Sequence, residues 1–278
     1  LADEYSGGRI EIINYPNATL GTEPEMLESV KNGTLDMVVT DPTVGSPYSK
    51  ELELFSLPFL FRDYDHWLSV LSGEIGKDYS DLILEKTGTL KIMAYWGGST
   101  RNVLAVKEPV TSIDDLQNFK LRLAASELKF SVWEAIGCLP VTIAFGETYS
   151  ALASGLCDGM ENEFPSILTA KFYEPAPYIT LTEHEITVRP LFMNNDAFNA
   201  MDAELQEALL RAIDEATVLA LQYEREMSEE AQNQMVNEFG VTLYEIDKAP
   251  IMERTQEIFS QFGEENGLSD MIARIQAE

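Results

Sequence analysis

Residues that commonly carry out chemistry are scarce in this sequence. The 278 residues include two cysteines and two histidines, and Cys138 and Cys157 lie 19 positions apart with no histidine between them. Structural zinc sites need Cys and His at close spacing, so no metal site is predicted. His66 and His184 lie outside any recognisable triad, which argues against a nucleophilic hydrolase. We expect both cysteines to be buried as small apolar side chains, and whether they pair stays open.

Positive charge is scarce as well. There are 19 Lys and Arg against 47 Asp and Glu, which gives a formal net charge of −28. Such a surface repels phosphate backbones and anionic lipid headgroups, because like charges oppose each other over most of it. The composition therefore argues against a nucleic-acid partner and against binding to a membrane surface.

Long apolar runs and phosphate-binding glycine loops are also missing. No run approaches the roughly 20 residues of a membrane span, and no basic and then apolar leader opens the chain. The paired glycines of "YWGGST" match neither GxGxxG nor GxxxxGK, so no cofactor is predicted. Because the chain opens at Leu1 with what reads as the last turn of a helix, we expect that an upstream segment, including a signal peptide, has been removed.

What the sequence does contain is a regular succession of strands and helices. Hydrophobic residues make up 45% of it, enough for a substantial core. An alternating strand is predicted over about 9–15. It is followed by a helix that Thr22 and Glu25 begin as a capping box and Gly33 ends, and then by the apolar strand "LDMVV". This order predicts a βαβ unit.

The same pattern continues along the chain. "LKIMAYW" and "NVLAV" predict two strands with a loop between them, "FKLRL", "LPVTIAF" and "CDGMEN" predict three more, and mainly parallel sheets are expected. From about 201 to 239 there is no Gly or Pro, and apolar residues recur at helical spacing: Leu205, Leu209, Ile213, Val218 and Leu221. This predicts one long helix, and since such a helix outruns a small domain, we expect it to brace two lobes.

Two arginines raise the question of what they face. Arg122 lies in the middle of "FKLRL", where a buried guanidinium needs either a carboxylate of the protein or one brought by a ligand. Arg101 follows the paired glycines between two predicted strands, a place where loops build binding sites. The residues alone leave both alternatives open for Arg122.

A series of segments, taken in order, resembles one family. They are "LGTEPEMLESVKNGTLDM", "LPFLFRDYDH", "GGSTRNVLAVKEPVTSIDDLQNFKLRL", "LPVTIAFGETYSALASGLCDGMEN" and "LTEH". In this order and spacing they are similar to the substrate-binding proteins of tripartite ATP-independent periplasmic (TRAP) transporters, the DctP family, over almost the whole chain. The resemblance implies an α/β, two-lobed fold like that of periplasmic binding proteins. In such a fold each lobe is a β-sheet flanked by helices, and strands and a long helix span both lobes.

The resemblance also implies a division of the chain and a function. Lobe I is expected over 1–98 and 188–227, and lobe II over 99–187 and 228–278, with the helix 201–239 as the bridge. The protein is expected to be a binding protein without catalytic residues, which captures an organic acid between the lobes and delivers it to TRAP membrane subunits. We expect a monomer in the periplasm, or a lipid-anchored extracellular protein if the source has no outer membrane.

Three polar residues match positions that contact the ligand in the family. Arg122 occupies the place of an arginine that forms a bidentate pair with the ligand carboxylate. Arg101 matches a second cationic contact, and Asn162 of "DGMEN" matches an amide that hydrogen-bonds the ligand. The resemblance therefore implies that Arg122 faces a ligand.

Three further residues complete the candidate site. Phe145 matches an apolar wall beside the ligand. Glu23 and Trp96 are also candidates, with a surface glutamate and a core tryptophan as the respective alternatives. Glu147 opens a helix and is explained by the helix dipole rather than by a ligand.

The chain departs from the family pattern at two places. "LRLAAS" replaces the usual Val-Pro after the arginine, so the backbone beyond Arg122 is expected to differ. Family members also begin with a strand and most of a helix ahead of "SGGRI", and this chain lacks them. We expect a sheet edge to be exposed as a result.

The favoured ligand is a carboxylated sugar or sugar acid, because Glu23, Asn102 and Trp96 offer hydrogen-bonding groups and a ring face for hydroxylated rings. A short dicarboxylate or a keto acid is the alternative within the family. An enzyme on the same scaffold, with Glu23 or Glu147 as base, and an interaction module that dimerises through the long helix are the alternatives from other classes.

Overall fold

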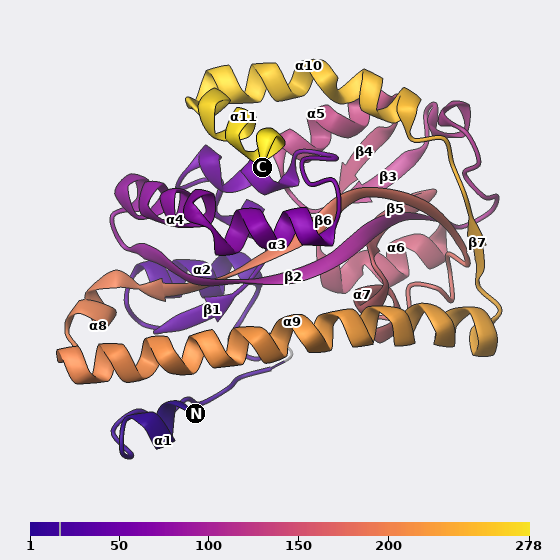
Figure 1. Ribbon diagram of the computed structural model, residues 1–278. Coiled ribbons are helices and arrows are strands. Elements are labelled where there is room, and N and C mark those ends of the chain that lie inside the picture. Colours follow the sequence, from indigo (N-terminus) through magenta and orange to yellow (C-terminus); the bar gives the residue numbers. More distant parts are fainter. Residues whose placement is uncertain (17) are drawn as a thin grey trace. The chain divides into compact units, whose positions relative to one another are not determined.

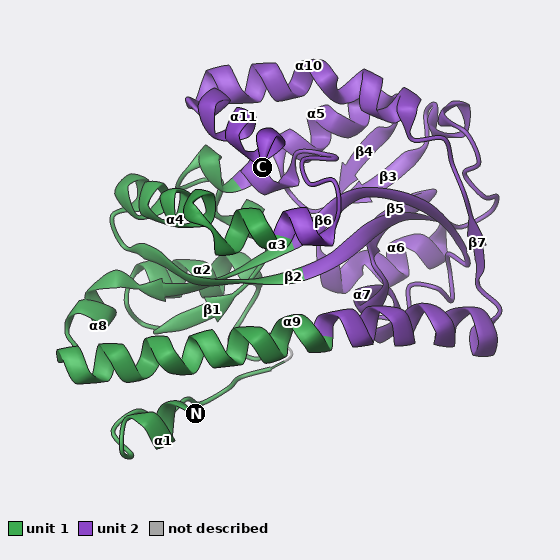
Figure 2. Ribbon diagram, in the orientation of Figure 1, with its two compact units in different colours: residues 1–52, 68–97, 188–223 green, residues 53–67, 98–187, 224–278 purple. Residues whose placement is uncertain are grey.

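The computed structural model describes residues 1–16 and 18–278, and these form two compact units. Unit 1 comprises residues 1–52, 68–97 and 188–223, and unit 2 comprises the rest, 53–67, 98–187 and 224–278 (Figure 2). Helix α3 (Tyr64–Ser72), strands β2 (Leu90–Ala105) and β6 (Tyr178–Asn194), and helix α9 (Ala203–Phe239) each contribute residues to both units. The chain therefore crosses between the units within regular elements.

Unit 1 contains the strand β1 (Met37–Val39) and parts of β2 and β6, together with several helices (Figure 1). Besides β1 and its parts of the shared elements, it is built from α1 (Ala2–Tyr5), α2 (Glu23–Lys31), α4 (Glu74–Thr87), α8 (Asn195–Asn199) and the 3-10 turns η1 (Pro42–Gly45) and η2 (Lys50–Ser56), the last of which ends in unit 2. The predicted capping box is confirmed, since Oε2 of Glu25 accepts hydrogen bonds from the backbone N–H and the hydroxyl of Thr22.

The strand predicted over 9–15 does not form. Strand β1 pairs with β6, and residues 10–16 run without regular structure, with Ile12, Ile13 and Tyr15 about half exposed or more. Alternation of apolar and polar residues makes a chain suitable for a sheet, but a strand needs a neighbour to satisfy its backbone groups. The βαβ prediction was therefore wrong for this segment.

Unit 2 contains the larger part of the sheet. Its own elements are η3 (Ile113–Leu116), β3 (Lys120–Leu123), α5 (Glu127–Ile136), β4 (Leu139–Thr142), η4 (Phe145–Glu147), α6 (Thr148–Ser154), β5 (Gly159–Glu163), α7 (Phe164–Thr169), β7 (Thr242–Tyr244), α10 (Ala249–Asn266) and α11 (Ser269–Ala277). Helices α5 and α10 pack against each other (Figure 1). The strands predicted from "FKLRL", "LPVTIAF" and "CDGMEN" are confirmed as β3, β4 and β5.

The strands form a mixed sheet rather than mainly parallel ones. The hydrogen-bonded order is β1-β6-β2-β5-β3-β4, with β7 on β6. Pairing is antiparallel between β1 and β6 and between β2 and β5, and parallel between β3 and both β4 and β5 and between β6 and β7. Succession of strands and helices in the sequence does not fix direction, because a long connection can return a strand in either sense.

The two strands predicted from "LKIMAYW" and "NVLAV" are one strand, β2. The loop prediction between them was wrong. Gly97 and Gly98 have φ of +105° and +103°, a conformation open to glycine, and they let the strand continue through an irregularity instead of ending it. Arg101 consequently lies within a strand and not in a loop.

Helix α9 confirms the long helix. It spans 37 residues from Ala203 to Phe239, or about 55 Å at 1.5 Å per residue. Both cysteines are buried, as expected, and the structure shows that they are free thiols.

Candidate functional site

The candidate residues of unit 2 lie on a ladder of three strands, β2, β5 and β3. Cross-strand partners point to the same face of a sheet, and neighbours along a strand point to opposite faces. Asn102 is opposite Asn162, and Arg122 is opposite Met160, so Asn162 and Arg122 lie on one face. Arg101 is opposite Glu163 and lies on the other face. The sheet therefore separates the two candidate arginines.

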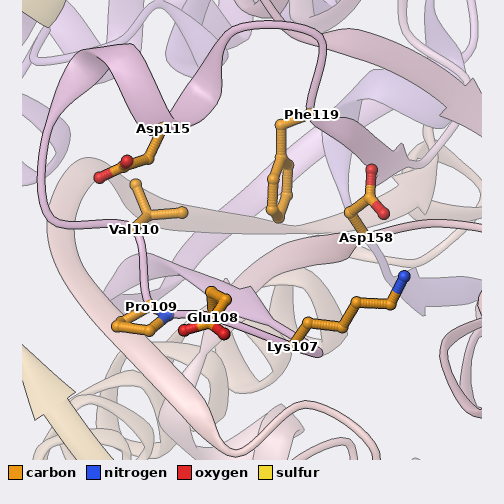
Figure 3. Close-up of a pocket in the computed structure, with 7 residues that line it drawn as sticks. All are labelled: Lys107, Glu108, Pro109, Val110, Asp115, Phe119 and Asp158. Atoms are coloured by element: carbon orange, nitrogen blue, oxygen red, sulfur yellow. The ribbon is translucent and has the colours of Figure 1, made fainter.

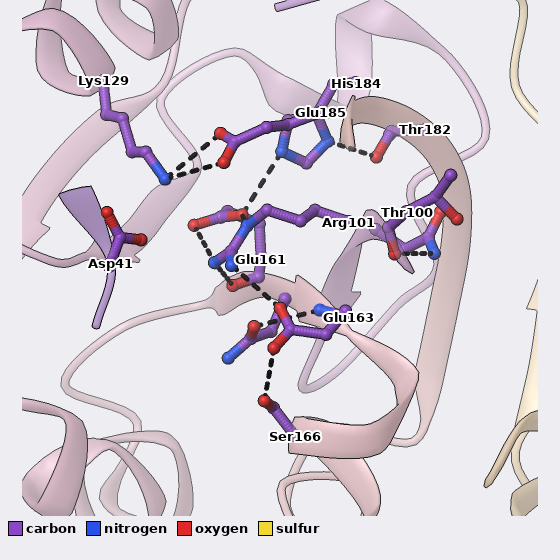
Figure 4. Close-up of polar contacts among 12 residues, drawn as sticks. Asp41, Thr100, Arg101, Lys129, Glu161, Glu163, Ser166, Thr182, His184 and Glu185 are labelled. Carbon is purple, nitrogen blue, oxygen red and sulfur yellow. Dashed lines mark hydrogen bonds and ion pairs between the residues drawn. The ribbon is translucent and has the colours of Figure 1, made fainter. Parts of the chain in front are cut away.

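Arg101 is buried and forms ion pairs with two glutamates of β5. Its Nε donates to Oε2 of Glu161 at 2.5 Å, and its Nη2 donates to Oε1 of the same carboxylate at 2.9 Å. Nη2 also donates to the main-chain carbonyl of Glu161, and Nη1 donates to Oε2 of Glu163 at 2.9 Å (Figure 4). Residues 161 and 163 lie on the face of Arg101, which is why one side chain reaches both.

These contacts shift the ionisation of the buried pair. Burial by itself lowers the pKa of Arg101, but the attraction of Glu161 and then Glu163 outweighs it, so that pKa is well above its usual value. Burial by itself raises the pKa of Glu161, but Arg101 and the hydrogen bond from His184 outweigh it, so that pKa is well below its usual value. Both groups are charged at neutral pH as a result.

The network extends to α5 and β6. His184 Nε2 lies 3.3 Å from Oε2 of Glu161, and His184 Nδ1 lies 2.9 Å from the hydroxyl of Thr182. Lys129 of α5 forms an ion pair with Glu185 at 3.1 Å, and both side chains are buried. "LTEH", one of the segments that carried the resemblance, thus supplies polar groups to a buried network.

Arg122 and Asn162 occupy the other face of the ladder. The Nε of Arg122 donates to the carbonyl of Ile143 at 2.9 Å, which fixes the plane of the guanidinium. Oδ1 of Asn162 accepts from the backbone N–H of Glu163 at 3.0 Å, whereas its Nδ2 has no hydrogen-bond partner within residues 1–16 and 18–278. Asn162 therefore presents a donor, and both residues are 3% exposed.

Phe145 follows Ile143, the residue that holds Arg122, by two positions. Its ring is 52% exposed and packs edge-on against the buried ring of Phe172, with centroids 5.3 Å apart. An exposed aromatic ring held by a buried one offers an apolar wall with a fixed orientation.

Glu23 and Trp96 belong to unit 1. Trp96 packs against the apolar cluster of that unit, and its indole N–H donates to the hydroxyl of Thr217 at 2.9 Å. Glu23 is the first residue of α2, where a carboxylate also stabilises the helix dipole. The structure thus gives each of these two residues a structural role, and their ligand contacts stay predictions.

A shallow surface pocket of about 240 Å³ lies at the far end of the same ladder, beyond Ala105 and before Gly159 (Figure 3). Two of its three carboxylates accept hydrogen bonds from the chain: Asp158 accepts from the backbone N–H of Lys120, and Asp115 accepts from Thr111 and Ser112. We therefore centre the candidate site on Arg122 and Asn162.

Comparison with known proteins places the chain in a family. Residues 1–266 match the model of the bacterial extracellular solute-binding protein family 7, DctP. The chain belongs to this family. It is 34% identical to a solute-binding protein of Sulfitobacter sp. (strain NAS-14.1), over 100% of this chain and 84% of that protein.

Solved structures of the family are close in fold. A TRAP periplasmic solute-binding protein from Chromohalobacter salexigens with bound D-glucuronate has a TM-score of 0.94 and 28% identity, with 99% of this chain and 91% of that chain covered. One from Xanthobacter autotrophicus with bound β-D-galacturonate has a TM-score of 0.93 and 30% identity, with the same coverage. The predicted family and fold class are thereby confirmed, and the relatives are transport proteins rather than enzymes.

This member of the DctP family also carries four buried charged residues near Arg101 that were not predicted from the sequence. Glu161, Glu163, Lys129 and Glu185 were not predicted as site residues. The signal was present for two of them, since Glu161 and Glu163 alternate around Asn162 in "MENE" and share the face that is opposite Arg101. Neither a group of side chains suited to a metal ion nor a helix able to span a membrane occurs in the part of the chain that the structure describes.

Proposed function

We propose that this protein binds a carboxylated sugar or sugar acid on the Arg122 face of unit 2 and delivers it to TRAP membrane subunits. Arg122 holds the carboxylate, Asn162 donates a further hydrogen bond, and Phe145 contacts an apolar face of the sugar. Arg101 lies on the opposite face of the ladder, where it makes four hydrogen bonds to Glu161 and Glu163, so its contact with a ligand stays a prediction from the resemblance alone.

The single observation that carries the proposal is the shared face of Arg122 and Asn162. The Nε of Arg122 donates to the carbonyl of Ile143, which fixes the plane of the guanidinium, and we assign the ligand carboxylate to the guanidinium on this face. The Nδ2 donor of Asn162 lies on the same face, two residues along β5 from the partner of Arg122. Donors from two adjacent strands suit a ligand rich in acceptor oxygens.

The expected energies are of the right size for a transport protein. Charge-assisted hydrogen bonds contribute about 1.5–3 kcal/mol each, so a two-bond fork and one amide bond supply about 5–9 kcal/mol. Micromolar affinity requires about 8 kcal/mol net of the costs of association. Apolar contact with Phe145 and the exclusion of water supply the difference.

The names of the relatives favour a sugar acid. The structures described above hold D-glucuronate and β-D-galacturonate, and a third, from Sulfitobacter, holds α-D-taluronate at 32% identity. A relative from Escherichia coli, 30% identical, is a 2,3-diketo-L-gulonate-binding periplasmic protein. A short dicarboxylate is the second candidate, because C4-dicarboxylate-binding proteins of Bacillus subtilis and Rhodobacter capsulatus are each 27% identical.

We also propose the setting in which the protein works. The family is extracellular, so the protein acts outside the cytoplasm, in the periplasm or on a lipid anchor, as a monomer. Glu23 and Trp96 of unit 1 remain candidates for the parts of the sugar away from the carboxylate.

A thermal-shift panel tests this function. D-glucuronate, D-galacturonate, 2,3-diketo-L-gulonate and succinate are each added to the protein, with D-glucose as the control that lacks a carboxylate. A ligand at 100 times its Kd stabilises the fold by about 2.7 kcal/mol, which raises Tm by several degrees. A shift with sugar acids alone supports the proposal, a shift with succinate alone supports the dicarboxylate, and no shift with any acid contradicts both. Mass spectrometry of the bound acid after denaturation must recover it unchanged.

A further inference from the structure

The charges behind Asn162 are organised around a single arginine. β5 carries Glu161 and Glu163 on one face and Asn162 between them on the other. Both carboxylates are 2% exposed, and Arg101 contacts both of them. Two like charges this deeply buried on one short strand repel each other, so the strand keeps this conformation because a cation lies between them.

Glu163 links this cation to the ligand-facing amide. One oxygen of its carboxylate accepts from Arg101, and the other accepts from the hydroxyl of Ser166 at 2.5 Å. Its backbone N–H donates to Oδ1 of Asn162. The position of that N–H therefore decides which atom of the Asn162 amide is held and which is presented.

We propose that Arg101, Glu161 and Glu163 form a positioning clamp: Arg101 fixes the backbone of residues 161–163 through the two carboxylates, and this orients Asn162 with its Nδ2 donor toward the ligand. The clamp acts from the face opposite the ligand. This inference deepens the proposed function and rests on it, because the clamp matters to binding only if Asn162 meets the ligand.

A positioning role and a direct ligand contact of Arg101 predict different effects when the charges of Glu161 and Glu163 are removed. If Arg101 serves chiefly to neutralise and hold the two glutamates, the loss of Arg101 lowers affinity because two uncompensated carboxylates remain. Neutralising those carboxylates as well then restores the affinity. If Arg101 serves chiefly by touching the ligand, removing the glutamate charges restores nothing.

The experiment compares three proteins by calorimetry with D-glucuronate at pH 7. The first is wild type, the second is Arg101→Met, and the third is the neutral variant E161Q/E163Q/R101M, in which each glutamine keeps the shape of the glutamate and one of its two acceptor oxygens. We expect Arg101→Met to lose about 100-fold in affinity or more, since breaking a buried pair leaves uncompensated charge. We expect the neutral variant to recover to within about tenfold of wild type.

A pH profile of Tm keeps the test independent of ligand binding. The titratable groups around Arg101 are Glu161 and Glu163 on β5, Glu185 and His184 on β6, and Lys129 on α5. In wild type the ion pair lowers the carboxyl pKa, so its stabilisation is present above the usual carboxyl range and is lost as pH falls through it. In Arg101→Met burial raises the same pKa values, so the sign reverses and Tm rises as pH falls from 8 to 5.

Arg254→Met is the control, because Nη1 of Arg254 also donates to a main-chain carbonyl, that of Ile136, but from an exposed position on helix α10. It is expected to keep the wild-type affinity. A neutral variant as weak as Arg101→Met, or an Arg101→Met protein whose Tm has the pH dependence of wild type, overturns the clamp. If wild type itself fails to bind any sugar acid, the proposed function fails, and the pH profile still decides whether the clamp exists.

Discussion

The two candidate arginines of unit 2 differ in the residues that surround their side chains. Arg101 lies on the face of the β2–β5–β3 ladder that also carries Glu161 and Glu163, and four of its hydrogen bonds end on those two residues. Arg122 lies on the opposite face, where its Nε is held by the carbonyl of Ile143 and the neighbouring polar side chain is the amide of Asn162. The two arginines thus have different surroundings, although a single strand, β5, lies between their strands.

The difference follows from strand register rather than from the arginines themselves. In β5 the residues alternate, so that the glutamates fall on one face and Met160 and Asn162 on the other. A guanidinium that meets two carboxylates of its own chain, as that of Arg101 does, is neutralised by them. The guanidinium of Arg122 lies on the other face and donates from Nε to a main-chain carbonyl. The two faces of β5 therefore separate the ion pairs of Arg101 from the face on which we propose that the ligand binds.

The largest effect is expected from Arg122→Lys. An ammonium supplies no planar fork, so at least one charge-assisted bond and the hold of Ile143 are lost. We expect affinity for a sugar acid to fall about 30- to 1,000-fold, or about 2–4 kcal/mol, in calorimetry. Unchanged affinity would remove Arg122 from the site and with it the contrast between the faces.

The control for this variant is Arg254→Lys. Arg254 also gives a hydrogen bond to a main-chain carbonyl, so the substitution matches the change in chemistry without touching the ladder. A comparable loss of affinity in both variants would mean that the effect is on stability and not on recognition.

A smaller effect is expected at the two asparagines that lie opposite each other. Both polar groups of the Asn102 amide have partners: Oδ1 accepts from the N–H of Glu183, and Nδ2 donates to the carbonyl of Thr100. In Asn162 only Oδ1 has a partner within the described residues, the N–H of Glu163. Asn162→Ala should therefore weaken binding by about 1–2 kcal/mol with a small change in Tm.

Asn102→Ala should do the reverse. The substitution leaves the partly buried N–H of Glu183 without its acceptor, so we expect about 1–3 kcal/mol of lost stability, measured by urea unfolding, and a smaller change in affinity. If both variants changed affinity and stability alike, the division between an internal and a presented amide would not hold.

Much of this arrangement was accessible from the sequence. The alternation in "FKLRL" located β3 and placed Arg122 on one face, and the capping box at Thr22 and the uninterrupted helical spacing of α9 were read correctly. These features are local, because their determinants lie within a few residues of each other.

What the sequence did not reveal depends on partners distant along the chain. Residues 9–15 alternate like a strand but find no neighbour, and Gly97 and Gly98 look like a loop but continue β2. The ion pairs of Arg101 depend on the register of β2 against β5, which joins positions about 60 apart. Alternation along one strand predicts which of its side chains lie on the same face of the sheet. The side chains that neighbouring strands add to that face depend on how the strands pair.

The smallest effect is expected at Phe145, which borders the ligand-facing side through its link to Ile143. Phe145→Leu keeps an apolar side chain but removes the flat ring and its edge-on contact with Phe172. We expect affinity for a sugar acid to fall about two- to tenfold, the size of an aromatic contact worth about 0.5–1.5 kcal/mol. Leu156→Ala, at an exposed apolar position elsewhere in unit 2, should leave affinity unchanged. A loss at Phe145 that is equal for D-glucuronate and succinate would show that the ring shields the carboxylate from water, whereas a loss confined to D-glucuronate would show that it contacts the sugar.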